Sequence, residues 1–245
     1  VSRLDRLGSR TEVVQMAATI GREFSYELIL GVLDLDANTL QEELEQLARA
    51  EVIFQQGVPP QAIYTFKHAL IQDAAYSSIL RKRLLDNHRT IGECFEKQFP
   101  QIVESKPALL AHHFTAAGVT DKAIQYWETA GKRSQASFAN IEAQSQFENG
   151  LKLLATLDES PERDQQELGF QLPLGTVMTM AGGWANPAVE KVHLRARELC
   201  ERLGEGSPIY HVTWGMWAWR LLRSELEIAD TLANDVLALS EGRDE

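Results

Sequence analysis

The sequence has very little cysteine, no long hydrophobic run and no signal-peptide pattern. Only two cysteines occur in 245 residues, Cys94 and Cys200, and both stand within helical apolar patterns. Such thiols are typical of small core residues in a reducing compartment, and they predict no disulfide framework. No stretch approaches the about 18 consecutive apolar residues that a membrane span needs. We therefore expect a cytoplasmic protein.

Positive charge is also scarce. The chain has 24 Lys and Arg against 35 Asp and Glu, so its formal net charge at pH 7 is −11. Nucleic acids and anionic lipid surfaces attract proteins through a basic surface, which this composition does not favour. We expect a protein or a small molecule as the partner, with no nucleic acid and no membrane.

Motifs that carry catalytic chemistry or bind metal are lacking as well. The nearest match to a phosphate-binding loop is Gly131-Lys132, but Arg133 stands where that loop needs a hydroxyl, which favours a helix instead. His112 and His113 are adjacent, and adjacent helical side chains point about 100° apart. We expect one of them in a helix interface and neither on a metal ion. The sequence predicts no catalytic residue, no metal site and no cofactor in this chain.

What the sequence does contain is helical periodicity over almost its whole length. Its first part predicts three helices: one that ends at Gly21, a short one capped by Ser25, and a third capped by Asp36 or Asn38. The third helix has an apolar stripe with acidic residues on its outer side. That stripe consists of Leu40, Leu44, Leu47 and Ala48.

The segment 52–66 differs, because two β-prone runs flank a turn rich in Gly and Pro. This pattern predicts a β-hairpin. Helices are predicted again over 68–80 and 81–99, the second ended by Pro100. Three helices followed by a hairpin is the order of a winged helix, so we expect a winged-helix domain at residues 1–90.

From Pro107 onward the pattern indicates helices in pairs, and the second helices of the pairs resemble one another. Matched positions at offsets 0, 4, 7 and 8 are Ala143, Phe147, Gly150 and Leu151, then Ala188, Val192, Arg195 and Ala196, then Ala229, Ala233, Val236 and Leu237. A period of roughly 40–45 residues suits a solenoid of helix pairs. We expect a mostly all-α fold with a tetratricopeptide-like array at 91–245, incomplete at its C-terminus. A helical bundle without repeats is the alternative.

The segment 214–219 has three tryptophans in six residues. On a helix Trp214, Trp217 and Leu221 share one face, which predicts packing in the core between repeats. Trp219 lies nearly opposite. It is the candidate anchor for a bound partner, because rigid aromatic side chains commonly fill this role.

Some strings are more specific than periodicity. They lie at 20–25, 66–76, 110–114, 122–127, 183–185 and 195–204, and include Phe66-Lys67-His68-Ala69-Leu70. Together they resemble, over essentially the whole chain, the region after the nucleotide-binding domain in bacterial signal-transduction ATPases with numerous domains. Proteins of this AAA/NACHT-like class are often fused to a class III adenylate or guanylate cyclase or to a protein kinase.

The resemblance implies a function without catalysis in this chain. In the family an ATPase domain holding ATP or ADP and Mg²⁺ precedes the winged helix, and the repeats sense an input. His68 matches the histidine that reaches the β-phosphate of bound ADP, a role that suits an imidazole. The acidic residue usual after that histidine is Ala69 here. The alternative for His68 is a helix N-terminal residue with no ligand role.

The expected function is therefore regulation: an effector or protein binds the repeats, and the winged helix passes the change to an upstream nucleotide-binding domain of the same chain. A stand-alone repeat scaffold is the second hypothesis. A transcription regulator is disfavoured, because Glu42, Glu43 and Glu45 on the third helix would repel DNA phosphates.

Overall fold

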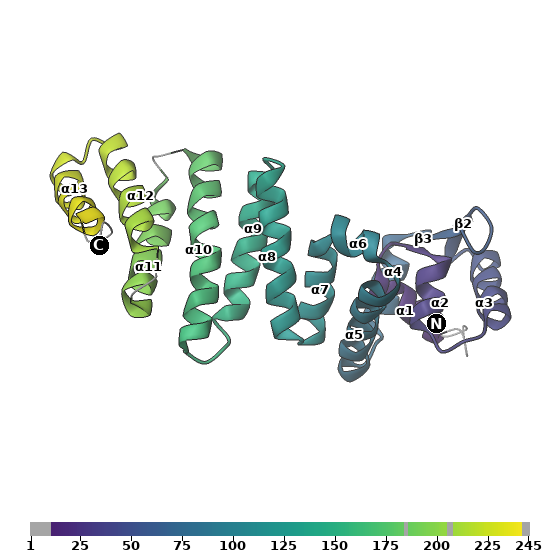
Figure 1. The fold of residues 1–245 in the computed structure, drawn as a ribbon. Coiled ribbons are helices and arrows are strands. Elements are labelled where there is room, and N and C mark those ends of the chain that lie inside the picture. Colours follow the sequence, from purple (N-terminus) through teal and green to yellow (C-terminus); the bar gives the residue numbers. More distant parts are fainter. Residues whose placement is uncertain (1–10, 184–185, 205–207, 242–245) are drawn as a thin grey trace. The chain divides into compact units, whose positions relative to one another are not determined.

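The computed structural model describes residues 11–183, 186–204 and 208–241 of the chain, with Figure 1 showing the order of the elements. Two compact units divide between Thr120 and Asp121 and are described separately below, as the N-terminal unit and the C-terminal unit. The described residues are mostly helical, with thirteen helices and one small sheet. The predicted fold class is confirmed.

The N-terminal unit begins with three helices and three strands in the order α1-β1-α2-α3-β2-β3. Their bounds are α1 Thr11–Ile20, β1 Glu23–Ser25, α2 Tyr26–Val32, α3 Ala37–Arg49, β2 Ile53–Gln56 and β3 Ile63–Phe66. Four helices follow: α4 Ala69–Ser77, α5 Arg81–Gln98, α6 Pro100–Ser105 and α7 Pro107–Ala117. The sheet has the antiparallel order β1-β3-β2, in which Phe24 pairs with Tyr64 and Phe54 with Thr65. The hairpin was predicted from the sequence, whereas β1 was not.

Local capping explains where the early helices start. The Ser25 hydroxyl accepts a hydrogen bond from the Leu28 backbone N–H at 3.2 Å, and it begins α2. The Asp36 carboxylate accepts from the Asn38 and Thr39 backbone N–H groups, so Asp36, not Asn38, caps α3. Such side chains satisfy helix N–H groups that have no partner within the helix. The hydroxyl of Thr39 also donates to Asp36, and these bonds together lower the pKa of that carboxyl.

The core of the N-terminal unit combines the apolar stripe of α3 with the aromatic face of the sheet. Leu40 and Leu44 are fully buried. The rings of Phe24 and Tyr64 stack at a centroid distance of 5.6 Å, and Phe66 lies beside Phe24. Burying one such side chain contributes about 1.5–3 kcal/mol, so this small core is enough to fix the sheet against the helix.

The predicted domain boundary at residues 90 and 91 falls inside α5, and the structure corrects it. Ile91 and Phe95 of α5 are buried in the N-terminal unit, where α5 packs on α1, α2 and α7. At Gly92 the helices α5 and α7 approach so closely that a Cβ would lie 2.9 Å from the Phe114 ring. Helices α5 to α7 therefore belong with the winged-helix-like elements and not with the helix pairs.

The C-terminal unit is a row of helices in which each packs on the next along the chain (Figure 1). Their bounds are α8 Thr120–Ala136, α9 Asn140–Leu154, α10 Pro161–Gly182, α11 Pro187–Leu203, α12 Ile209–Leu222 and α13 Leu226–Glu241. The three aligned sequence segments fall on α9, α11 and α13, each the second helix of a pair. Of the small residues that head them, Ala143 and Ala229 are buried and Ala188 is partly buried against a core cluster.

Glycine and phenylalanine set the spacing of the first helices in this row. A Cβ at Gly131 of α8 would lie 2.3 Å from the Phe147 ring of α9, and one at Gly150 of α9 would lie 2.1 Å from the Phe170 ring of α10. No side chain tolerates such distances, so glycine is required for these close approaches. The motif Gly131-Lys132 thus lies within a helix, as predicted, but Gly131 is buried and does not lie on the helix surface.

Ion pairs join α10 to α11. Arg195 binds both carboxylate oxygens of Glu167, at 2.7 and 2.8 Å, and Arg202 lies 2.9 Å from the buried Asp164. The hydrogen bonds from Arg195 lower the pKa of the Glu167 carboxyl. Paired, bidentate contacts of this kind fix the register of one helix against its neighbour. Among the described residues, no helix has both the length and the apolar character required to cross a membrane.

Candidate functional site

His68 lies at the junction of β3 and α4, where its side chain is exposed. It is the residue that precedes the first turn of α4, and its side chain makes no capping hydrogen bond. Leu70 beside it is 80% exposed. The neighbouring Lys67 is occupied, because its ammonium group lies 3.0 Å from Glu51 and 5.4 Å from the centroid of the Phe54 ring. An accessible imidazole beside exposed apolar surface is thus available for contact, while its role stays a prediction.

Trp219 is buried, which corrects the prediction that its side chain is available to a partner. Only 2% of it is exposed, and it belongs to the core cluster that includes Val177 and Val189. The guanidinium groups of Arg220 and Arg223 lie 4.9 and 4.7 Å from its ring. Trp219 is therefore a core residue and not a partner-binding anchor.

The face predicted for the core is wrong for Trp214 and Leu221, whereas Trp217 is partly buried and packs against a core cluster, as predicted. Helix α12 buries Val212, Met216 and Trp219 at i, i+4 and i+7, whereas Trp214 is 51% exposed and Leu221 is 42% exposed. Both faces carry large apolar side chains, so periodicity alone does not identify the one that meets a neighbouring helix. Trp214 is the tryptophan that sequence reasoning missed as a surface residue.

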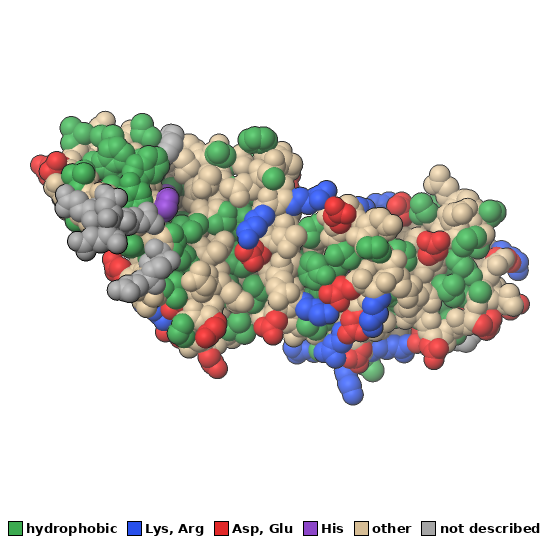
Figure 2. Space-filling view, viewed as in Figure 1, with side chains coloured by type: hydrophobic (Ala, Val, Ile, Leu, Met, Phe, Trp, Pro, Cys, Tyr) green, Lys and Arg blue, Asp and Glu red, His purple; other side chains and the backbone are tan. Residues whose placement is uncertain are grey.

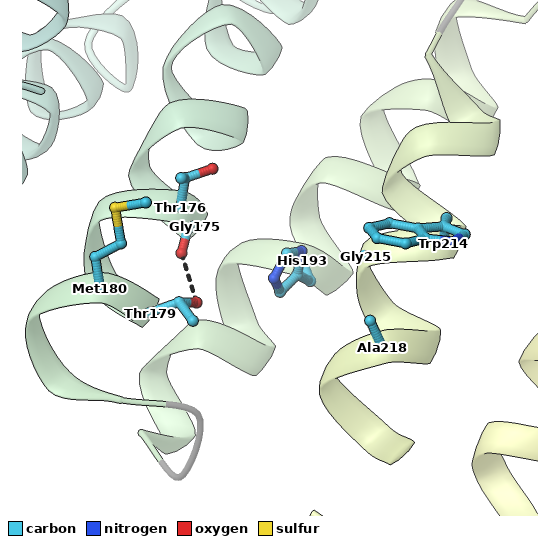
Figure 3. Close-up of a pocket in the computed structure, with 8 residues that line it drawn as sticks. All are labelled: Gly175, Thr176, Thr179, Met180, His193, Trp214, Gly215 and Ala218. Carbon is cyan, nitrogen blue, oxygen red and sulfur yellow. Dashed lines mark hydrogen bonds between the residues drawn. The ribbon is translucent and has the colours of Figure 1, made fainter. Parts of the chain in front are cut away.

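Trp214 forms one side of a hollow between α10, α11 and α12, here called the α10–α12 hollow. Its volume is about 250 Å³, and Figure 3 shows the lining side chains of α10 and α12 on either side of α11. The lining residues are Gly175, Thr176, Thr179 and Met180 of α10, His193 of α11, and Trp214, Gly215 and Ala218 of α12.

Small residues open the hollow and large apolar ones form its sides. Gly175 and Gly215 face the partly buried ring of His193; a Cβ at Gly175 would lie 3.4 Å from its Cε1 atom, and one at Gly215 would lie 3.6 Å from it. Met180 is 60% exposed and contributes a thioether, while Trp214 contributes an indole face. Flexible thioethers and indoles adapt well to flat apolar groups.

The polar groups of the hollow are nearly all engaged. The Thr179 hydroxyl donates to the Gly175 carbonyl at 2.8 Å, a bond drawn in Figure 3, and the Thr176 hydroxyl donates to the Leu172 carbonyl at 3.3 Å. His193 makes no hydrogen bond to any other described residue, and burial lowers its pKa, which keeps the ring neutral at pH 7. No Lys, Arg, Asp or Glu is among the described lining residues.

A buried pair of histidines lies within the N-terminal unit. Nδ1 of His88 on α5 lies 2.9 Å from Nδ1 of His113 on α7, and Nε2 of His88 lies 3.0 Å from the Tyr76 hydroxyl. Burial lowers the pKa of His88 to about 4, and burial together with His88 lowers that of His113 to about 3. His112 is exposed, so the prediction of one interfacial histidine is confirmed. Nothing in the sequence singled out His88 as its partner.

No group of three or more His, Cys, Asp or Glu side chains is placed to hold a metal ion within residues 11–183, 186–204 and 208–241. Cys94 and Cys200 are buried in their helices, as expected. The accessible histidines and the hollow are thus the features with unused binding capacity.

Comparison with known proteins gives limited guidance. No family model matches the chain. A protein of Rhizobium meliloti (strain 1021), described as uncharacterized, is 27% identical over 219 residues, which is 88% of this chain and 21% of that protein. The chain thus spans about a fifth of the length of the relative that it matches.

Among solved structures, BtubC (BKLC) from P. vanneervenii is similar over 100% of this chain and 93% of its own. Its sequence identity is 14% and its TM-score 0.33. That likeness is too weak to support an argument about fold or function.

Proposed function

We propose that this chain is a non-catalytic regulatory region of a bacterial multidomain signal-transduction ATPase in the cytoplasm. In this proposal the C-terminal unit is a tetratricopeptide-like array that binds an effector. The N-terminal unit is a winged helix that contacts an upstream nucleotide-binding domain. The main supporting observation is the order α1-β1-α2-α3-β2-β3, followed at once by the exposed His68 at the start of α4.

His68 supports the proposal through its accessibility and its sequence context. It stands in the string Phe66-Lys67-His68-Ala69-Leu70, which resembles the nucleotide-sensing motif of that class. The imidazole can donate a hydrogen bond to a phosphate oxygen. In the proposed closed state it reaches the β-phosphate of ADP held by the upstream domain, and the exposed Leu70 is covered by that domain.

The acidic surface of α3 favours a domain contact over DNA. Glu42 is exposed and Glu45 partly so, and Glu45 is paired with Arg49 at 2.9 Å. A winged helix that inserts this helix into a major groove would bring these carboxylates toward phosphates. Within the proposal, α3 is therefore a surface for protein contacts.

Coupling between the units requires an effector that binds one arrangement of the protein better than another. A ligand with equal affinity for both arrangements would change nothing, however tightly it bound. The division of the chain into two compact units is compatible with such a change in arrangement.

The test begins with the reading frame around the chain. A phosphate-binding loop and its acidic magnesium partner upstream of residue 1 are expected. The full-length protein is then loaded with a fluorescent ADP analogue, and its release is followed after mixing with excess ATP. His68→Leu should accelerate release by about tenfold, the loss expected for one charge-assisted hydrogen bond.

His211→Leu is the matched control, because His211 is an exposed histidine on α12. Release from this variant should equal that of the unmodified protein. Equal release rates for His68→Leu and the unmodified protein would remove the nucleotide-sensing role. An open reading frame that starts just before residue 1 would remove the ATPase as a whole.

The second candidate is a stand-alone scaffold for protein contacts, and exposed apolar side chains of the last two helices favour it. Figure 2 shows hydrophobic side chains gathered over α12 and α13. Among the apolar side chains exposed on these helices are Leu222 at 58%, Leu226 at 63% and Leu237 at 59%. Contiguous surface of this kind commonly marks an interaction site.

A further inference from the structure

The α10–α12 hollow has the features of a small-molecule site, and the helices of the C-terminal unit leave it open where they pack. It is bounded by three helices and is lined mostly by apolar groups; the imidazole of His193 and the indole N–H of Trp214 are lining groups that make no hydrogen bond to another described residue. Ligand sites commonly combine an apolar lining with a few convergent polar groups.

We infer that the α10–α12 hollow binds a small, uncharged aromatic molecule that carries one hydrogen-bonding group directed at His193. This inference deepens the proposed effector-binding role of the helix pairs and rests on it, but it is independent of His68. It names both the place where the effector binds and its chemical class.

The shape of the hollow argues for a flat ring. Trp214 offers a half-exposed indole face, and Met180 offers a thioether from the opposite helix, as Figure 3 shows. Between them Gly175, Gly215 and Ala218 carry little or no side chain. Aromatic rings stack on indole faces and contact thioethers favourably, so a mono- or bicyclic ring fits this space better than a branched chain.

The chemistry of the lining argues for an uncharged ligand with one polar substituent. No charged residue is among the described lining residues, and burial keeps His193 neutral, so a charged ligand would lose its hydration without gaining a counter-charge. The threonine hydroxyls donate to carbonyls of their own helix. His193 offers an imidazole nitrogen that can accept a hydrogen bond from a ligand hydroxyl or N–H, whereas the indole N–H of Trp214 can only donate.

The small number of polar groups in the lining also disfavours a peptide as the ligand. An extended segment brings a row of backbone N–H and C=O groups that need partners when they leave water. The described lining offers one imidazole and one indole N–H with no hydrogen bond to another described residue. At about 250 Å³ it is also smaller than the sites that hold larger ligands.

The experiment uses the 245-residue chain labelled with ¹³C-methyl methionine, and the probe is 4-ethylphenol. The chain has four methionines: Met16, Met178, Met180 and Met216. Met180 lines the hollow, whereas Met16 lies in α1 of the N-terminal unit. The Met180 methyl resonance should shift and saturate with a Kd of about 0.1–1 mM, and the Met16 resonance should stay in place.

Ligand class is tested with two relatives of the probe. The anionic 4-hydroxyphenylacetate and the non-aromatic 4-ethylcyclohexanol should each bind at least about fivefold more weakly, because one lacks a counter-charge and the other cannot stack on Trp214. Equal binding of either compound would overturn the proposed class. Saturation by a tryptophan-containing peptide, with none by 4-ethylphenol, would overturn it in favour of a peptide site.

Three variants localise the binding. Ala218→Leu fills the hollow and should weaken the binding of 4-ethylphenol by at least about tenfold. Ala238→Leu, on the exposed part of α13, is the matched control and should leave that binding unchanged. His193→Leu should weaken the binding of 4-ethylphenol by about 3–10-fold but leave the binding of ethylbenzene unchanged, since ethylbenzene has no hydroxyl.

If Ala218→Leu does not fold, as judged by far-ultraviolet circular dichroism, Trp214→Ala replaces it. Trp214 is half exposed, so its removal spares the core, and binding should weaken by about 2–10-fold. Leu222→Ala, at an exposed position of α12 outside the lining, is its control. The inference is wrong if the Met180 resonance does not saturate up to the solubility limit of the probe. The ADP-release test of His68 in the full-length protein is unaffected by that result.

Discussion

The two units of this chain are held together in different ways. In the N-terminal unit, contacts join residues far apart in the sequence: Asn87 donates to the Thr19 hydroxyl at 3.4 Å, and Arg83 pairs with Glu12 at 2.6 Å. In the C-terminal unit most contacts join successive helices, as with Arg195 and Glu167, although Arg197 of α11 also binds Asp235 of α13. Long-range contacts favour all-or-none unfolding, whereas nearest-neighbour contacts let a row of helices lose stability locally.

The spectroscopic reporters are divided in the same way, which makes the comparison measurable. All five tryptophans follow Asp121, so tryptophan fluorescence reports on the C-terminal unit. Met16 is buried in α1, so its methyl resonance reports on the N-terminal unit.

The largest effect is expected at the glycine that contacts Phe170. Gly150→Ala places a Cβ within about 2 Å of that ring, and relieving this overlap should cost about 3 kcal/mol of stability or more. Urea unfolding followed by tryptophan fluorescence should show the loss, while the Met16 resonance should report little change.

Gly169→Ala is the matched control for this change. A Cβ there would lie 3.6 Å from a Glu128 oxygen, an ordinary contact, and Gly169 stands inside α10. Alanine should therefore raise stability by up to about 1 kcal/mol. Equal effects at both glycines would contradict the packing described here.

The next effect is acid sensitivity of the N-terminal unit. The pKa values of His88 and His113 are lowered to about 4 and about 3, so below pH 6.5 the unfolded chain binds protons that the folded unit does not. Stability must then fall as the pH falls from 6.5 toward 4. From pH 7 to pH 5 the loss should be about 2–3 kcal/mol, since coupled groups do not add in full.

Among the described residues, the groups that face this pair are the exposed His112 and the Tyr76 hydroxyl, and no carboxylate acts on the pKa of either histidine. Urea unfolding followed by the Met16 resonance at pH 7, 6 and 5 measures the loss. His193 has a lowered pKa too, but it is one histidine, so the C-terminal unit should lose less. A pH-independent midpoint for the N-terminal unit would rule out a buried neutral pair.

The smallest effect is expected at a helix cap of the N-terminal unit. Ser25→Ala removes the acceptor for the Leu28 N–H and should cost about 1 kcal/mol. Ser105→Ala, at the exposed end of α6, is the control and should change stability by less than about 0.5 kcal/mol. The Met16 resonance again measures both. If Ser25→Ala lowered the stability of the N-terminal unit as much as Gly150→Ala lowers that of the C-terminal unit, the two units would not differ in how well they tolerate these substitutions.

Local signals predicted much of the fold. Ser25, Asp36 and Pro100 mark element ends in the sequence, and each does so in the structure. Strand β1 was missed because it has three residues and pairs with Tyr64, about forty residues away. Helix α10 runs through Pro173, where sequence rules predict an end, and it packs against both α9 and α11.

The candidate site was predicted less well, and for a physical reason. His68 was found because its neighbours resemble a known motif. Trp214, Met180 and His193 come from three helices, and no spacing within one helix indicates that they share a hollow. The predicted domain boundary at residue 90 was wrong for a similar reason. Helix α5 packs against α1 and α7, and its own sequence does not indicate these partners.

The contacts between glycine and an aromatic ring carry one further consequence. At Gly92, Gly131 and Gly150 a phenylalanine occupies the place of the missing side chain. At Gly175 and Gly215 the facing residue is His193, whose ring stays farther away. At three close approaches between helices a phenylalanine ring thus fills the space beside the glycine, whereas at the α10–α12 hollow that space stays open. The inferred ligand site thus depends on one exchange of ring: the smaller, polar imidazole of His193 faces the glycines of the hollow, where a phenylalanine faces the glycine in the other three helix contacts.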